Sequence, residues 1–266
     1  MRPTPTFSLI VPTHQRAQLL QRCIASVRRQ GLAAEVELIV VSDAVDAATD
    51  LVCGQALTSQ DIYLRRNGQP GPSESRNLGL ALAKGRYVLF LDDDDTLCDG
   101  FLAALQARPE LALGKAVVTD CAVVTESRPD TGPVELERQA LASSTTLNEG
   151  VYIKNQVPFS CFVWPRQDLQ GLRFDVHMKA YEDWEFVLQT LTRSVPLPVG
   201  LPGPCIHVVK DDTTDRRGSS EAAQDQRAVM DYLYVYQRHP APSDAVREQR
   251  LALMQMFGVP LPASAY

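Results

Sequence analysis

Residues 76–95 read R-N-L-G-L-A-L-A-K-G-R-Y-V-L-F-L-D-D-D-D, and this stretch decides how the chain folds. An apolar stripe at helical spacing begins at Leu78, with Ser73 before it as a predicted helix cap and Gly85 after it as the predicted stop. Residues 87–91 are continuously apolar, which is typical of a strand covered on both faces. The stretch therefore predicts a helix, a turn and a buried strand that ends in a run of carboxylates.

Asp92, Asp93, Asp94 and Asp95 follow that strand directly. Adjacent acids repel one another, so they need a cation, hydrogen-bond donors or open water to stay ionised. A solvated acidic turn would meet that need, but open α/β sheets bind ligands at the carboxyl ends of their strands, which favours a binding site. On an extended segment Asp92 and Asp94 point to the same side. Oxygen ligands of this kind select a hard cation, Mg²⁺ or Mn²⁺, which completes its shell with phosphate oxygens and water.

The pattern R-N-x-G-x-x-x-A-x-G followed by L-D-D-D-D resembles the donor site of family-2 glycosyltransferases of the GT-A fold. In that family the D-x-D acids hold a metal ion and the diphosphate of a nucleotide sugar. The resemblance implies a metal-ligand role for Asp94, and contact with the metal or the donor for Asp92 and Asp93. It also implies that Arg76 faces the donor's phosphates and that the cofactor is Mn²⁺ or Mg²⁺.

The composition limits the class of protein. The chain has 266 residues, 45% of them apolar and 22% charged, enough for one large α/β domain or two small ones. A formal net charge of -6 argues against nucleic acid as the main partner. No window approaches roughly eighteen uninterrupted apolar residues, and Pro12 and His14 interrupt any N-terminal signal sequence. The six cysteines form no C-x-x-C pair, so we expect buried thiols and a cytoplasmic protein, either free or peripheral at the membrane.

The first half of the chain alternates strands and helices. Apolar runs predict strands at 7–11, 37–41 and 62–64, and helical periodicity predicts helices at 15–30 and 46–57. Alternation with short connections implies a central, mostly parallel sheet with right-handed crossovers and flanking helices. The predicted fold class is therefore α/β, and the resemblance makes it the GT-A-like fold of nucleotide-diphospho-sugar transferases.

Asp43 ends the second predicted strand, so we expect it at the same edge of the sheet as the acidic run. The resemblance implies that this acid binds the base or ribose and that Pro12 and Thr13 line the base pocket. The sequence departs from the family here: residues 42–45 read S-D-A-V rather than D-D-G-S, and H-Q follows Thr13 in place of an aromatic-Asn pair. The alternative for Asp43 is a helix-capping acid in an ordinary loop between strand and helix.

The second half carries the predicted acceptor site. Strands are predicted at 115–124 and within 151–164. Residues 165–186, P-R-Q-D-L-Q-G-L-R-F-D-V-H-M-K-A-Y-E-D-W-E-F, resemble the family's acceptor-side segment, in which an Asp at the start of a helix is the general base. That resemblance assigns the catalytic role to Asp183, in a helix predicted to begin near Glu182. Ordinary acids at a helix N-terminus, stabilised by the helix dipole, are the alternative for both residues.

His207 ends an apolar run, where a histidine is commonly a hydrogen-bonded core residue. In the family, however, a histidine after the acceptor helix can complete the metal's coordination, so the resemblance implies His207 as a metal ligand with Asp94. Lys210 and the pair Arg216-Arg217 either belong to a loop that covers the diphosphate or are solvated charges.

Two amphipathic segments near the C-terminus predict a helical extension. These helices either pack on the domain or form a homodimer contact. We predict one GT-A-like domain followed by this extension, with the boundaries as follows: domain 1–215, nucleotide-binding half 1–114, acceptor-binding half 115–215, helical extension 216–266, and helices at 222–238 and 243–256.

By resemblance the activity is metal-dependent, inverting transfer of a sugar from a nucleotide-diphosphate donor, taken as UDP-linked, to the hydroxyl of a glycan, lipid-linked or small-molecule acceptor. Asp183 would deprotonate that hydroxyl as it attacks the anomeric carbon. Processive synthases carry Q-x-x-R-W, whereas Gln189 is followed here by T-L-T-R, so we expect one sugar per encounter. Two alternatives remain: a non-catalytic nucleotide-sugar-binding module, and a sugar nucleotidyltransferase, whose Gly-rich phosphate loop has no counterpart at residues 11–20.

Overall fold

The first half of the chain forms a parallel sheet. The computed structural model describes residues 4–129, 132–210 and 226–262. The first four strands stand in the order β3-β2-β1-β4 and all pair in parallel, as predicted. Their bounds are β1 Phe7–Thr13, β2 Val36–Ser42, β3 Ile62–Arg65 and β4 Tyr87–Phe90.

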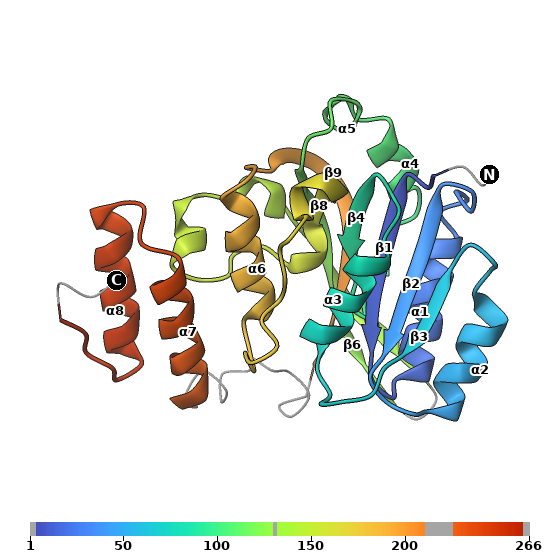
Figure 1. Ribbon diagram of the computed structural model, residues 1–266, viewed down its shortest axis with the longest axis horizontal. Coiled ribbons are helices and arrows are strands. Elements are labelled where there is room, and N and C mark those ends of the chain that lie inside the picture. The colour runs from blue at the N-terminus through green and yellow to red at the C-terminus, as the bar shows by residue number, and fades with distance from the viewer. Residues whose placement is uncertain (1–3, 130–131, 211–225, 263–266) are drawn as a thin grey trace.

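Helices lie on both faces of this sheet, and others extend the molecule to one side (Figure 1). The α-helices are α1 Ala17–Arg28, α2 Ala47–Ala56, α3 Pro72–Leu82, α4 Phe101–Gln106, α5 Pro109–Ala112, α6 Glu182–Leu191, α7 Gln226–Arg238 and α8 Asp244–Met256. Short 3₁₀ helices are η1 Ser143–Thr145, η2 Glu149–Tyr152, η3 Phe159–Cys161 and η4 Arg166–Leu169.

Alternate residues of the central strands belong to two apolar clusters, one on each face of the sheet. On one face Leu9 is buried in the same cluster as Ile24 of α1. On the other face Ile10 is buried in the same cluster as Trp184 of α6. Because side chains alternate along a strand, burial on both faces requires the continuous apolar runs that the sequence shows.

The second half extends the sheet with strands of both directions. β6 pairs in parallel with β9, whereas β8 is antiparallel to β4 and β6, β5 is antiparallel to β9, and β7 is antiparallel to β6. The whole sheet is thus mixed rather than mostly parallel, although its strands and helices form the α/β class that was predicted. The bounds are β5 Thr96–Leu97, β6 Val117–Ser127, β7 Val134–Leu141, β8 Phe162–Pro165 and β9 Leu197–Val209.

Two expectations about the second half differ from the structure. The apolar runs at 151–164 form mainly loops and the short helices η2 and η3, with strand only at β8. Pro158 interrupts this segment and Pro165 ends β8, and proline lacks the N–H that a strand interior needs. β7 was also not predicted: Val134 and Leu136 alternate with acids over only four residues, and every side chain of the strand is exposed.

The helix that carries Arg76 begins and ends differently from the prediction. Gly71, not Ser73, is the N-cap of α3, and Pro72 opens the helix with its fixed φ. Gly71 takes φ +150°, which glycine adopts readily and other residues do not. Gly85 lies beyond the helix end, and a Cβ at that position would come within 2.6 Å of the backbone nitrogen of Ser8. Gly85 is therefore required for close contact with β1 rather than as a helix stop.

The C-terminal helices pack on the rest of the molecule. Tyr232 and Tyr236 of α7 lie with ring centroids 5.0 and 6.2 Å from that of Trp184 in α6. The fully buried Arg250 of α8 donates to the carbonyls of Tyr152 and His239 at 2.8 Å each. The predicted packing of these helices on the domain is present, and their role in a homodimer stays a prediction.

Part of the sequence interpretation lies outside the described residues. This applies to Arg216, Arg217 and the predicted boundary at 215/216. Among the residues that the structure describes, every helix is too short or too polar to cross a lipid bilayer.

Candidate active site

The predicted nucleotide-site residues meet at the carboxyl ends of β1, β2 and β4. The backbone N–H of Asp43, just after β2, donates to the carbonyl of Thr13 at 3.2 Å. The Thr13 hydroxyl, at the end of β1, donates to Oδ2 of Asp93 at 2.7 Å. These bonds join three strand ends at one edge, as expected for a parallel sheet in this order.

The side chain of Asp43 is 5% exposed, and both of its carboxylate oxygens are hydrogen-bonded. Oδ1 lies 2.5 Å from Nδ1 of His14, and Oδ2 accepts from the Gly71 N–H at 2.6 Å and from Nη2 of Arg66 at 3.4 Å. The acid that caps α2 is Asp46, which accepts from the N–H groups of the first turn. Asp43 therefore does not cap the helix that follows its strand, and instead holds the loop before α3 against the strand ends.

The acidic run divides into two accessible and two buried acids. The backbone N–H of Asp95 donates to the Asp92 carbonyl at 3.0 Å, so the run is a tight turn rather than the extended segment that was expected. The side chains of Asp92 and Asp94 are 46% and 25% exposed, whereas Asp93 and Asp95 are each 5% exposed. The turn still presents Asp92 and Asp94 toward solvent.

Burial changes the ionisation of the two inner acids. It raises the pKa of Asp93 to about 7, against the opposing effect of the Thr13 hydroxyl bond. Burial also raises the pKa of Asp95 well above its usual range, and the charges of Asp94 and Asp92 add to the effect. Asp95 accepts from the backbone N–H of His207 at 3.0 Å and from the Ser160 hydroxyl at 3.3 Å. The accessible pair is thus the part of the run that suits a cation.

Arg76 links the acidic run to the predicted acceptor side. Its guanidinium donates from Nη2 to Asp92 at 2.8 Å and from Nη1 to Glu182 at 3.0 Å. The side chain is buried between the rings of Phe159 and Phe174, 5.4 and 5.5 Å from their centroids. Burial alone would lower the Arg76 pKa, but the charges of Asp92 and Glu182 outweigh it and raise that pKa. Its Nε is buried and has no hydrogen-bond partner among the described residues.

Asp183 lies in the first turn of α6, next to Glu182. Its Oδ1 accepts from the N–H of Trp184 at 2.7 Å, and its Oδ2 lies 3.5 Å from the amide nitrogen of Asn155. Burial raises its pKa to about 6, the charge of Glu182 adds to the effect, and Arg76 opposes it. A carboxyl group with a pKa near neutrality at the start of a helix is suited to accept a proton.

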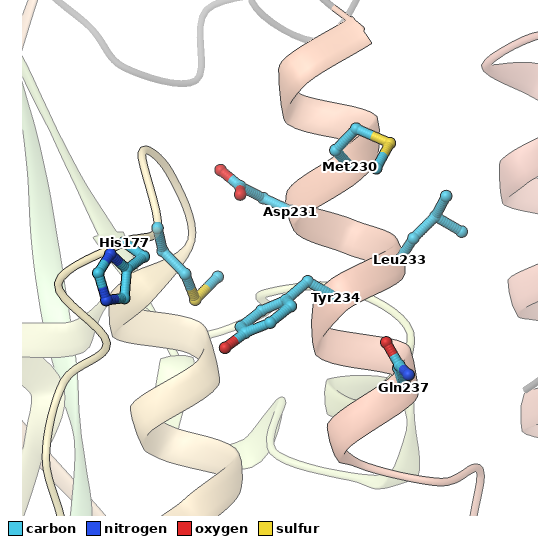
Figure 2. A pocket seen from close by; sticks show the side chains of 7 residues that line it. His177, Met230, Asp231, Leu233, Tyr234 and Gln237 are labelled. Carbon is cyan, nitrogen blue, oxygen red and sulfur yellow. The ribbon is translucent and has the colours of Figure 1, made fainter.

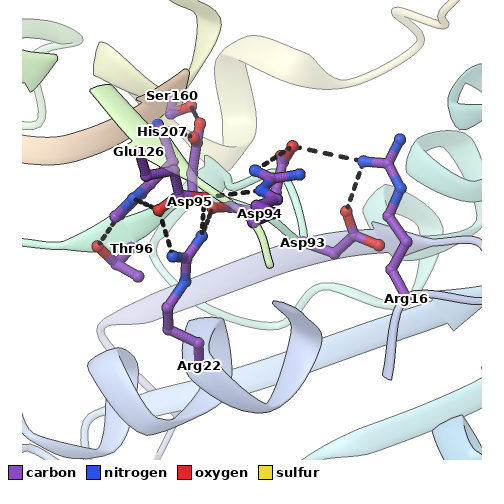
Figure 3. Close-up of polar contacts among 10 residues, drawn as sticks. Arg16, Arg22, Asp93, Asp94, Asp95, Thr96, Glu126, Ser160 and His207 are labelled. Carbon is purple, nitrogen blue, oxygen red and sulfur yellow. Dashed lines mark hydrogen bonds and ion pairs between the residues drawn. The ribbon is translucent and has the colours of Figure 1, made fainter. Parts of the chain in front are cut away.

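His207 is part of a buried network behind the acidic run (Figure 3). Its Nδ1 lies 2.8 Å from Glu126, and its Nε2 lies 3.0 Å from the Thr96 hydroxyl. Glu126 also accepts from Arg22 at 2.6 Å, and such bonds lower its pKa to about 2 although burial opposes this. Burial and the Arg22 charge lower the His207 pKa, so the ring is neutral at neutral pH. The ionised Glu126 then requires the proton on Nδ1, and Nε2 accepts from Thr96.

The residues present fit a divalent cation only at the accessible acids. Among the described residues, no group of three or more His, Cys, Asp or Glu side chains is arranged to hold a metal ion. Nε2 of His207, the atom that would bind one, is occupied by Thr96. Asp92 and Asp94 offer oxygen ligands, and Mg²⁺ or Mn²⁺ needs one or two carboxylates when a diphosphate completes its shell. The side chain of Asp94 is 25% exposed and that of His207 is 7% exposed, so the acid is the more accessible of the two predicted ligands.

Several residues of the site were not predicted from the sequence. Nη1 of Arg16 lies 3.4 Å from Oδ2 of Asp94, and Nη2 of Arg128 lies 3.5 Å from the same oxygen. Arg22 donates to the Asp94 carbonyl at 2.7 Å as well as to Glu126. The available signal was Glu126 itself, an acid directly after the predicted strand at 115–124 and its following Thr125, since a buried carboxylate requires a partner. Nothing in the sequence indicated which basic side chain that partner would be.

The family whose sequence model matches the chain is described as glycosyl transferase family 2, and the match covers residues 8–162. GalNAc(5)-diNAcBac-PP-undecaprenol beta-1,3-glucosyltransferase of Campylobacter jejuni is 36% identical over 107 residues, covering 39% of this chain and 34% of that protein. The uncharacterized glycosyltransferase EpsJ of Bacillus subtilis is 26% identical, covering 69% of this chain and 55% of that protein. The aligned chain therefore spans about a third and about half of these two relatives.

A longer alignment joins the chain to the putative colanic acid biosynthesis glycosyl transferase WcaA of Escherichia coli, 24% identical over 90% of this chain and 83% of that protein. Among solved structures, S. aureus TarS 1–349 in complex with UDP-GlcNAc has a TM-score of 0.62 at 17% identity, covering 93% of this chain and 71% of that one. TarS in complex with UDP gives a TM-score of 0.59 at 16% identity. At such identity the likeness shows a shared fold.

Proposed function

Because the chain belongs to glycosyl transferase family 2 and is a glycosyltransferase, we propose that it transfers one sugar at a time from a UDP-linked donor to an acceptor hydroxyl, with inversion at the anomeric carbon. The observation that carries this proposal is the Arg76 guanidinium. It bonds Asp92 of the acidic run and Glu182 of the helix that bears Asp183. The acids assigned to the donor thereby lie beside the acid assigned to the base.

The proposed donor site lies at the edge of the sheet formed by the carboxyl ends of β1, β2 and β4. The TarS structures contain UDP and UDP-GlcNAc, which supports a uridine nucleotide for this chain. Pro12, Thr13 and Asp43 would hold the nucleoside at the ends of β1 and β2. Arg76 and Asp92 would face the diphosphate, while the buried Asp93 would act by fixing the Thr13 hydroxyl.

Asp94, together with Asp92, would hold Mn²⁺ or Mg²⁺. When bound, such a cation would stabilise the negative charge that develops on the departing diphosphate, which is a Lewis-acid role. His207 would join these ligands only by giving up its bond to Thr96, so we propose Asp94 as the principal protein ligand. The network of Glu126, Arg22 and His207 fixes the turn that carries Asp94.

Asp183 would be the general base. With a pKa of about 6 it is mostly ionised at neutral pH and can take the proton of the acceptor hydroxyl. The hydroxyl oxygen then attacks the anomeric carbon from the face opposite the leaving diphosphate, which inverts the configuration. Glu182 is less suited to this task because its carboxylate is held by Arg76.

The acceptor is proposed only as a class. The names of two relatives, those from Campylobacter jejuni and Bacillus spizizenii, refer to a polyprenyl-diphosphate-linked saccharide and to poly(ribitol-phosphate). A hydroxyl of a lipid-linked or polymer-linked glycan is therefore the first class to test, in the cytoplasm or at the membrane surface. The alternatives of a nucleotidyltransferase and a non-catalytic module are not favoured, because the family match is to glycosyltransferases.

A nucleotide panel tests the proposal. Thermal unfolding is measured with UDP, GDP, CDP and dTDP, each with and without Mn²⁺, and UDP release is measured from UDP-GlcNAc and UDP-glucose. We expect UDP with Mn²⁺ to stabilise the protein most, by about 2.7 kcal/mol at a hundredfold excess over Kd. Stronger stabilisation by another nucleotide would refute the uridine assignment, and equal stabilisation without Mn²⁺ would refute the metal.

A further inference from the structure

The helix that bears Asp183 starts from a strained residue. Tyr181, the N-cap of α6, has φ 61° and ψ 17°. This left-handed conformation is common for glycine but uncommon for a bulky residue. Such a conformation has an energetic cost and persists only where the surroundings enforce it. It sets the direction of the first turn of α6, and therefore the direction of the side chain two residues later.

Asp231 of α7 enforces this conformation from outside the helix. Its Oδ2 accepts from the N–H of Ala180 at 2.9 Å and from the N–H of Lys179 at 3.3 Å. The next residue of α7, Tyr232, places its ring centroid 4.7 Å from that of Tyr181 in an edge-to-face contact. One turn of α7 thus contacts both the backbone that precedes Tyr181 and the ring of Tyr181 itself.

Packing around this segment is incomplete on the side that faces α7. A cavity of about 360 Å³ lies between the segment and α7, lined by His177, Met178, Met230 and Asp231 among others. Figure 2 shows the Asp231 carboxylate directed from α7 toward the segment that carries His177. Because this space next to His177 and Met178 is unfilled, the N–H bonds to Asp231 add to the packing of the Tyr181 ring in holding residues 179–181.

We propose that Asp231 is a positioning residue for the transfer reaction: it holds the turn at residues 179–181 so that Asp183 is presented to the acceptor hydroxyl. This inference rests on the proposed role of Asp183. It assigns a catalytic contribution to the C-terminal helices, which lie outside the matched family segment at 8–162.

The test compares Asp231→Ala with Asp231→Asn. The Asn amide oxygen can accept the same N–H bonds, so it should preserve the turn, whereas Ala cannot. We expect Asp231→Ala to lower kcat for UDP release from UDP-GlcNAc by roughly tenfold to a hundredfold, the effect of a small misplacement, with KM unchanged. Asp231→Asn should stay near the parental rate. A parental rate for Asp231→Ala, or an equal loss for Asp231→Asn, would overturn the proposal.

Tyr234→Phe is the matched control. It removes a 2.6 Å bond from Tyr234 to Asp175 in the same contact between segment and helix, without touching residues 179–181. Its rate should equal the parental one. If Asp231→Ala fails to fold, Asp231→Glu replaces it, since a longer carboxylate displaces the turn while keeping the charge, and it should also slow release.

Two measurements separate this inference from the proposed base. If Asp231 acts through Asp183, Asp231→Ala should cause no further loss in an Asp183→Asn background, and a fully additive loss would overturn the inference. Hydrogen exchange at the amides of Lys179 and Ala180 should be faster in Asp231→Ala, and unchanged exchange would likewise overturn it. If Asp183→Asn alone retains the parental rate, the base assignment has failed, while the exchange measurement still decides whether Asp231 holds the turn.

Discussion

At the scale of single residues, Glu182 and Asp183 differ in what surrounds them, although they are adjacent. Glu182 is paired with Arg76, whereas Asp183 has a pKa raised to about 6. Asp183→Asn keeps the shape but cannot take a proton, so the turnover rate should fall by roughly 10²–10⁴ while UDP still binds. The parental rate should rise with pH through about 6 and then level off, because the base must be ionised. A parental rate in Asp183→Asn, or complete loss in Glu182→Gln alone, would contradict this assignment.

Asp94 should carry the metal-dependent part of nucleotide binding. Clustered acids repel a diphosphate unless a cation lies between them. We expect Asp94→Ala to abolish the increase in UDP affinity that Mn²⁺ produces, as measured by calorimetry. Asp99→Ala is the control, since Asp99 is 78% exposed and its replacement changes the net charge equally. Mn²⁺-dependent binding that survives in Asp94→Ala would exclude this acid as the ligand.

Asp93 should make the protein less stable as the pH rises. Its pKa is raised from 3.8 to about 7 on folding, so the folded state binds more protons than the unfolded state between these values. The free energy of unfolding therefore falls as pH increases through this window. Between pH 5 and pH 8 Asp93 should account for roughly 2–3 kcal/mol of that loss. Urea unfolding of the parent and of Asp93→Asn at both pH values measures it, and an equal pH dependence in the two proteins would contradict it.

At the scale of elements, the sequence predicted the strands that are buried on both faces and missed the strand that is exposed. The runs that became β1 and β2 were recognisable because every residue in them is buried. By contrast β7 is wholly exposed, and the apolar residues near Val157 and Phe159 fill a core from loops and short helices. An apolar run shows that a segment is buried, but only its contacts decide whether it forms a strand.

The position of α3 depends on one close contact. A Cβ at Gly79 would overlap Cγ2 of Ile10 in β1, so Gly79→Ala requires either the Ile10 side chain or the helix that carries Arg76 to shift. We expect a loss of about 1–3 kcal/mol in the free energy of unfolding, together with weaker UDP binding. Gly54→Ala in α2 is the control, because nothing lies within 4 Å of its added Cβ, and it should be neutral or slightly stabilising. Equal effects of the two substitutions would contradict this account.

At the scale of the whole molecule, we expect the C-terminal helices to unfold together with the rest of the chain, because Arg250 links the two. Its buried guanidinium donates to carbonyls of η2 and of the segment after α7, and it lies 4.2 Å from the ring centroid of Tyr236. Arg250→Ala leaves buried carbonyls unpaired and should cost roughly 3–5 kcal/mol. Arg247→Ala, on the exposed side of the same helix, should change stability by less than about 0.5 kcal/mol. A single shifted unfolding transition in Arg250→Ala supports one cooperative unit, and an unchanged midpoint would refute it.

The candidate site shows the same division between what sequence reveals and what it does not. Acids at strand ends were predictable, because Asp43 and the acidic run follow recognisable strands of known direction. The cations around them were not, since Arg22 and Arg128 come from a helix and a loop that are far apart in the chain. Arginine is common on protein surfaces, so only the folded arrangement distinguishes these two from solvated charges.

The single guanidinium of Arg76 is bonded both to Asp92 in the first half of the chain and to Glu182 in the second half. A diphosphate that draws this side chain from Asp92 also changes its bond to Glu182, and a ligand near Glu182 acts on Asp92 in turn. Donor and acceptor affinities are then linked by a single coupling free energy, and thermodynamic reciprocity makes the factor equal in both directions. The size of that coupling then depends on the rotamer of Arg76.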